Sequence, residues 1–159
     1  MVSSVKKPSP VGFVLKFALL FGIPYAAMHF ADTGLVTNAV ASAEALMFRV
    51  GGFAVSQNAS LLFVEGVPFE IVADCTGLMM VFLLLALLWA TPVDENRRLR
   101  AFLVWTPFLL GLNLLRMFIT LFVGVSAPQL MDAAHVALWF VDSGAVVLIW
   151  MHEAEVILW

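Results

Sequence analysis

Long apolar runs are the feature that most constrains how this chain can fold. One occupies residues 11–30, and three more occupy residues 76–90, 101–123 and 133–156. A helix needs about 20 predominantly apolar residues to cross the ~30 Å hydrocarbon core of a bilayer. The whole chain is 63% apolar and only 12% charged, whereas soluble domains carry roughly 25% charged residues. We therefore predict an all-α integral membrane protein with about four transmembrane helices at these positions.

The length of the chain favours one compact unit. A chain of 159 residues accommodates a handful of spans with short loops but hardly a separate soluble domain, so we expect a single membrane domain over residues 1–159. Lys6 and Lys7 precede the first apolar run, as in a secretory signal, and the small residues at 41–43 resemble a cleavage site. Because this run is long enough to span and the triplet lies well beyond its end, we expect it to remain as a transmembrane helix.

The segment between the first two spans, residues 31–75, is more polar than the spans. Residues 37–55 follow a mixed helical pattern that ends near Gly51 and Gly52, which favours an amphipathic helix on the membrane surface over a further span. Two short apolar runs then flank residues 65–68, "EGVP", and predict a short hairpin. A hairpin exposed to lipid would leave backbone groups unpaired, so we place it outside the bilayer.

Basic residues in the short connections predict the orientation of the chain. Lysine and arginine favour the cytoplasmic side of a membrane. They gather before the first span and between the second and third spans, as Lys6, Lys7, Arg97, Arg98 and Arg100. With four spans both basic segments face the cytoplasm, and residues 31–75 lie outside. We therefore predict a multi-pass protein of the cytoplasmic (inner) membrane, an arrangement that a fifth span at residues 37–55 would break.

Charge and cysteine content exclude several classes of function. The net charge of −3 and the lack of a long basic run argue against a nucleic acid partner. Cys75 is the only cysteine, so it can form no internal disulfide and no thiolate metal cluster, and we expect neither a metal nor a cofactor. Its place at the start of a helix favours the thiolate, whereas Asp74, a candidate N-cap, opposes it. The direction of the net pKa shift stays open.

Three reactive side chains from three different spans are predicted to lie on the outer side. Cys75 stands where the second span begins, and His135 stands at the outer start of the fourth. Arg116 lies roughly 15 residues into the third span, or roughly 23 Å from the cytoplasmic side of a ~30 Å core. A charged residue at that depth normally faces a partner or a wet cavity. A thiol, a proton carrier and a fixed positive charge are the groups that acyl transfer requires.

Two further polar residues suggest how these groups are held. Asp142 lies two helical turns beyond His135 on the same face, at a depth similar to that of Arg116, so that Arg116 and Asp142 can pair. Asn113, one turn before Arg116, can form a hydrogen bond in the same cavity. The same ion pair could equally be a structural lock between two spans of a non-enzymatic membrane subunit, in which Cys75 is inert.

The motifs "DCTG", "NLLR" and "DAAH" resemble the signature of the exosortase and archaeosortase family. The family pattern is a cysteine, a small hydroxyl residue and a glycine, then Asn-x-x-Arg in a span, then a histidine or arginine at the start of a later span. The residues that match this pattern in order are Cys75, Thr76, Gly77, Asn113, Arg116 and His135. Many members have more spans than this chain, so it resembles a short member that consists of the catalytic core. Thr76 stands where serine is common.

The resemblance implies a membrane-embedded cysteine transpeptidase with its active site on the extracytoplasmic face. Its substrates would be secreted proteins whose C-terminal tail contains a recognition motif, a membrane helix and a basic end. Cys75 would attack the scissile carbonyl to form a thioacyl intermediate, Arg116 would stabilise the oxyanion, and His135 would act as base or acid or orient the site. An acceptor amine on a membrane lipid or a surface polymer would then resolve the thioester. The supporting or substrate-binding residues would be Asp74, Thr76, Gly77, Asn113 and Asp142.

Overall fold

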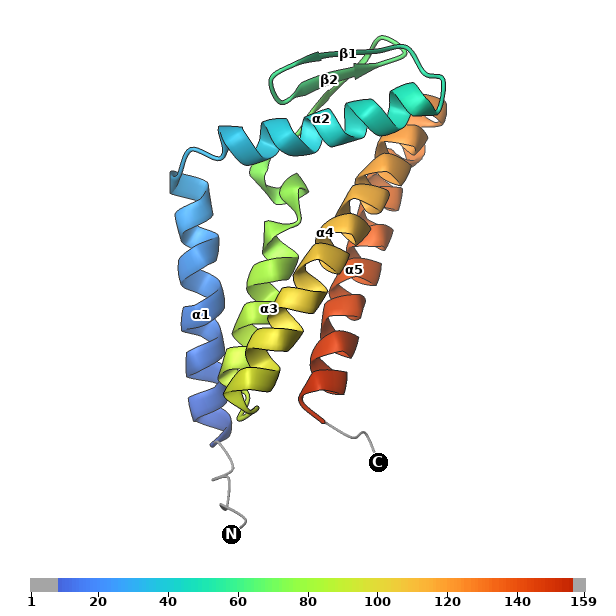
Figure 1. Ribbon diagram of the computed structural model, residues 1–159. Coiled ribbons are helices and arrows are strands. Elements are labelled where there is room, and N and C mark those ends of the chain that lie inside the picture. Colours follow the sequence, from blue (N-terminus) through green and yellow to red (C-terminus); the bar gives the residue numbers. More distant parts are fainter. Residues whose placement is uncertain (1–8, 156–159) are drawn as a thin grey trace.

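A computed structural model describes residues 9–155, so the predicted basic N-terminus and residue 156 of the last apolar run lie outside the described residues. The described part contains five α-helices and one small sheet (Figure 1). The helices are α1 (Pro10–Phe30), α2 (Gly34–Val50), α3 (Leu78–Ala90), α4 (Glu95–Ser126) and α5 (Met131–Glu153). The strands are β1 (Val55–Asn58), β2 (Leu61–Val64) and β3 (Val67–Glu70), and the short 3-10 helices are η1 (Ala73–Thr76) and η2 (Pro128–Leu130).

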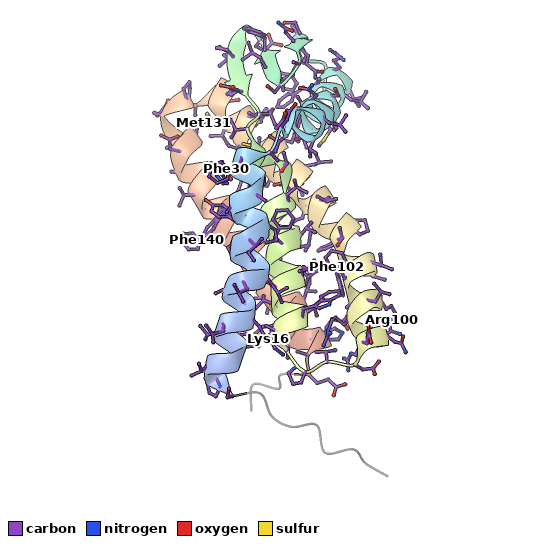
Figure 2. All side chains as sticks on the ribbon, turned by 90° about the vertical axis from the view of Figure 1, so that its left-hand side faces the viewer. Lys16, Phe30, Arg100, Phe102, Met131 and Phe140 are labelled. Carbon is purple, nitrogen blue, oxygen red and sulfur yellow. The ribbon has the colours of Figure 1, made fainter. Side chains whose placement is uncertain are left out.

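Four helices run alongside one another, and α2 lies across one end of them with the sheet above it (Figure 1). Helices α1, α4 and α5 are long and apolar enough to cross a membrane, whereas α3 is apolar but only 13 residues long. Large apolar side chains such as Phe140, which is 65% exposed, point away from the bundle, as expected for surfaces that face lipid (Figure 2). The prediction of an all-α membrane protein is confirmed.

The two ends of the bundle differ in chemistry. Phe30 and Met131 lie toward the end that carries α2 and the sheet, whereas Lys16 and Arg100 lie toward the opposite end (Figure 2). The beginning of α1 and the end of α5 are also at that basic end (Figure 1). We call the end with α2 the outer end, in keeping with the predicted orientation.

Helix α4 is longer than the apolar run at residues 101–123 because its first turn is polar and capped. The Asp94 carboxylate accepts hydrogen bonds from the backbone N–H groups of Asn96 and Arg97 at 3.1 and 3.3 Å. Such a cap satisfies amide groups that have no partner within the helix. Near the same end, Glu153 of α5 accepts a hydrogen bond from Trp105 Nε1 of α4 at 2.9 Å, which joins the two helices there.

The outer segment differs in detail from the prediction for residues 31–75. Helix α2 is a surface helix, but it ends at Val50 and the chain then forms β1, a polar strand that the sequence pattern did not indicate. The sheet is antiparallel in the order β1, β2, β3. Glu65 and Gly66 alone form the turn between β2 and β3, with φ values of 51° and 81°, as a two-residue hairpin turn requires. Pro68, predicted in the turn, lies in β3.

The packed interior of the outer end joins α2, the sheet and α4. Buried apolar side chains from all three elements form one cluster, whose members are Ala41, Ala45, Phe48, Leu62, Val64, Phe69, Ile71, Met117 and Leu121. Cys75 packs against this cluster. A second cluster joins α3, α4 and α5 toward the inner end. The candidate nucleophile Cys75 therefore packs against the buried interior of the protein.

One ionisable residue is fully buried on α2, the helix that contributes Ala41, Ala45 and Phe48 to the first cluster. The side chain of Glu44 on α2 is fully buried, and neither of its carboxylate oxygens has a hydrogen-bond partner among the described residues. Burial disfavours the charged form and raises the pKa of Glu44 from 4.5 to about 8. This carboxyl is therefore largely protonated at neutral pH.

We expect Glu44→Gln to remove a pH dependence of stability. Between pH 4.5 and about 8 the unfolded chain loses the Glu44 proton while the folded chain keeps it, so the free energy of unfolding falls by about 1.4 kcal/mol per pH unit as the pH rises. Glutamine does not titrate, so the variant lacks this contribution to the pH dependence of the free energy of unfolding. Thermal unfolding in detergent across this pH range measures the slope.

Glu70→Gln is the matched control, because Glu70 is exposed on β3. This variant should keep the wild-type slope. An equal slope in Glu44→Gln and wild type would contradict the buried, proton-bearing state of Glu44.

Candidate active site

Cys75 lies in η1, the short helical turn between the sheet and α3. The Cys75 N–H donates to the Val72 carbonyl oxygen at 2.9 Å. The next residue, Thr76, is buried and its hydroxyl donates to the Ala73 carbonyl oxygen at 2.6 Å. These local bonds hold the turn in one conformation and leave the thiol half-buried.

Gly77 separates η1 from α3, which is why α3 begins at Leu78 and not at Thr76 as predicted. Its φ is +79°, a left-handed conformation that residues with a Cβ rarely adopt. A Cβ at this position would also lie 2.9 Å from Cβ and Cγ of Asn113. Glycine is thus needed both for the turn and for the close approach of α4.

Asn113 of α4 joins the third span to η1, the turn that carries the candidate nucleophile Cys75 and that we call the nucleophile turn. Its side chain is 1% exposed, and Nδ2 donates to the carbonyl oxygen of Cys75 at 2.8 Å. Its Oδ1 is buried and has no hydrogen-bond partner within residues 9–155. The structure therefore brings together Cys75, Thr76, Gly77 and Asn113, which the sequence pattern grouped.

Arg116 follows one turn later on α4 and is also buried. Its Nη1 lies 3.4 Å from Oδ2 of Asp142 on α5, the pair that the sequence predicted. Its Nε–H has no acceptor among the described side chains and backbone groups. The backbone carbonyl of Arg116 accepts from the Thr120 hydroxyl at 2.9 Å. The pair is thus buried, and neither the Nε–H of Arg116 nor Oδ2 of Asp142 makes a hydrogen bond within residues 9–155.

His135 lies two turns before Asp142 near the outer start of α5 and is half-buried. Arg116 is close enough for its charge to act on His135. Within the described part of the chain, no hydrogen bond links His135 to the Cys75 thiol. The positive charge of Arg116 acts on both His135 and the Cys75 thiol.

The pKa of the Cys75 thiol is raised above its ordinary value. Burial is the largest cause; a backbone hydrogen bond with Val72 and the positive charge of Arg116 act in the opposite direction, and the negative charge of Asp74 adds to the rise. This settles the direction that the sequence left open. The resting thiol is protonated at neutral pH and needs a base to become nucleophilic.

Sequence reasoning did not connect the first span to the nucleophile. His29, at the outer end of α1, has its Nε2 at 3.8 Å from the Asp74 carboxylate, while its Nδ1 lies 3.0 Å from the Tyr25 carbonyl oxygen. Asp74 itself is exposed and lies beside His29, and it is not the predicted N-cap of the second span, because Gly77 occupies that position before α3. Only the packing of α1 beside α3 brings these residues together, and neither residue's local sequence signals it. His29 is thus a second imidazole adjacent to the nucleophile turn.

Within residues 9–155, no group of three or more His, Cys, Asp or Glu side chains is arranged to hold a metal ion. The reactive groups at the outer end include a thiol, imidazoles, a guanidinium, an amide and carboxyl groups.

Charge changes beside Cys75 are expected to move its pKa in opposite directions. Asp74→Asn removes a negative charge that disfavours the thiolate, so the pH midpoint of alkylation should fall. Arg116→Gln removes a positive charge that favours the thiolate, so the midpoint should rise. The measurement is the pH dependence of Cys75 alkylation by a membrane-impermeant maleimide in oriented membranes.

Controls separate charge from folding. Arg116→Lys keeps the charge and should leave the midpoint close to that of wild type. The double variant Arg116→Gln/Asp142→Asn avoids a buried unpaired carboxylate and should still show the rise. Identical midpoints in Asp74→Asn, Arg116→Gln and wild type would refute the electrostatic description of the site.

Comparison with known proteins identifies the family of the chain. Residues 8–151 match the model of the transmembrane exosortase family. No curated protein and no solved structure matches the chain. The family match spans all five helices up to the last turn of α5 and includes every candidate site residue. The chain therefore belongs to the transmembrane exosortase family.

Proposed function

We propose that this protein is a cysteine transpeptidase that cleaves C-terminal sorting signals of secreted proteins at the outer end of its helix bundle. Cys75 is the nucleophile, and cleavage passes through a thioacyl intermediate. The acyl group is then transferred to an acceptor amine.

One contact supports this proposal above all. Asn113 Nδ2 donates to the carbonyl oxygen of Cys75 at 2.8 Å, and Arg116, one turn further on the same helix, acts electrostatically on the thiol. A single face of α4 therefore both fixes the backbone of the nucleophile and supplies a positive charge beside it. A cysteine with a purely structural role has no need of such an arrangement.

Arg116 is suited to stabilise an oxyanion. Its Nη1 lies 3.4 Å from Asp142 Oδ2, and this ion pair favours one orientation of the guanidinium. Its Nε–H is a buried donor with no acceptor in the described structure, which costs free energy at rest and is relieved when negative charge develops beside it. Loss of a donor of this kind typically lowers kcat by about 10²–10³.

The proposed reaction has two acyl transfers. The Cys75 sulfur loses its proton to a base and attacks the scissile carbonyl carbon, which gives a tetrahedral oxyanion beside Arg116. Collapse breaks the C–N bond, and the leaving amine of the tail takes up a proton. The acceptor amine then attacks the thioester carbonyl, and the Cys75 sulfur leaves and is reprotonated.

His135 is the proposed proton carrier. The raised pKa of Cys75 means that the thiol must be deprotonated during attack. Since no bond joins His135 to Cys75 at rest among the described residues, proton transfer requires a bridging water or the bound tail itself, and catalytic hydrogen bonds often form only in the substrate complex.

The substrates we propose are secreted proteins with a tail of motif, membrane helix and basic end. Such a helix would lie beside the bundle, place its basic end at the inner side and present the motif at the height of Cys75. The acceptor amine belongs to a membrane lipid or a surface polymer.

A second candidate function rests on the ion pair. A non-enzymatic membrane subunit would also gain from a buried Arg116–Asp142 contact between α4 and α5. It would not require the Asn113 bond to Cys75, and it predicts that Cys75 can be replaced without loss of function.

Cleavage of a reporter tests the two functions. The assay contains the protein in proteoliposomes and a reporter whose C-terminus has a motif, an apolar helix and a basic end. We expect Cys75→Ala to abolish cleavage because it removes the nucleophile. Arg116→Gln should lower kcat by about 10²–10³ through loss of oxyanion stabilisation, and His135→Ala by about 10²–10⁴ through loss of proton transfer.

Ser56→Ala is the control, because Ser56 is exposed on β1 in the sheet above α2. It should cleave at the wild-type rate. Cleavage by Cys75→Ala at the wild-type rate would contradict the transpeptidase proposal and favour the non-enzymatic membrane subunit. Thermal unfolding of each variant shows that loss of activity is not loss of fold.

A further inference from the structure

An apolar cavity of about 280 Å³ lies between α2, α3 and α4 beside the nucleophile turn. Helix α2 contributes four lining residues, among them Ala39 and Ala43, and α4 contributes Leu110 and Leu114. Thr76, the residue after Cys75, forms part of its wall. The space exists because α2, which crosses over the ends of α3 and α4 (Figure 1), presents small and β-branched side chains there.

The residues that line the cavity indicate which kind of group can bind there. All lining residues except Thr76 are aliphatic, and the Thr76 hydroxyl already donates to the Ala73 carbonyl oxygen. Among residues 9–155, no charged group lines the cavity to bind a polar ligand. An aliphatic side chain gains from burial in such a site in proportion to the apolar area removed from water.

We propose that this cavity is the specificity subsite of the enzyme and receives an aliphatic side chain next to the scissile bond of the protein substrate. The inference rests on the proposed function. Thr76 belongs both to the cavity wall and to the turn that carries Cys75. When the scissile carbonyl of a substrate lies at Cys75, the side chain of a neighbouring substrate residue would therefore lie near the cavity. A lipid acyl chain is the competing occupant, and it would not depend on the sequence of the tail.

The experiment fills the cavity by mutation and measures which residue the enzyme prefers beside the cleaved bond. Reporter tails differ only at the residues flanking the cleaved bond, which carry leucine or alanine, and the bond itself is located by mass spectrometry of the products. Wild type should prefer leucine at one flanking position by at least about 10-fold in kcat/KM, as expected for a pocket that binds several methylenes. Ala43→Leu should abolish that preference mainly by slowing cleavage of the leucine tail.

Ala26→Leu is the matched control, since it makes the same change on an exposed face of α1 and should keep the leucine preference. Equal slowing of both tails by Ala43→Leu, with the preference unchanged, would overturn the subsite and indicate a structural or lipid-filled cavity. So would a wild-type enzyme that cleaves both tails equally. If wild type cleaves no tail while Cys75 remains alkylatable, the proposed function itself fails and the subsite fails with it.

Discussion

The buried guanidinium of Arg116 is the constraint on which the outer half of this bundle depends. A charge inside a spanning helix costs about 2.5 kcal/mol or more even on lenient scales, so the fold must surround it with compensating groups. Asp142 supplies the opposite charge from α5. Removing one member of such a pair leaves an uncompensated charge and is strongly destabilising. Helices α4 and α5 are therefore joined to one another at the depth of Arg116.

The same face of α4 fixes the turn that carries Cys75. Asn113 lies one turn from Arg116 and bonds to the carbonyl oxygen of Cys75, while the lack of a Cβ at Gly77 lets the turn approach α4 closely. One long helix thus holds both the backbone at Cys75 and the guanidinium that we propose as the oxyanion donor. Preorganised donors of this kind cost no reorganisation at the moment of reaction.

The sequence predicted the parts of the fold that rest on long apolar runs, because lipid imposes length and composition on a spanning helix. It also predicted the Arg116–Asp142 pair, since depth and helical spacing are readable from residue numbers. The contact of His29 with Asp74 was not predictable, because it depends on how α1 packs beside α3. Nor was the burial of Glu44, which depends on how α2 packs against the sheet and α4.

The most direct test of covalent catalysis is the mass of the protein after acid quench of a reaction with the reporter tail. The account predicts that Cys75 carries the N-terminal fragment of the reporter as a thioester, and that hydroxylamine releases the fragment and restores the free thiol. Accumulation should increase when the acceptor amine is withheld. Cleavage of the tail with no adduct on Cys75 at any quench time, and with the thiol still open to alkylation throughout, would contradict the account.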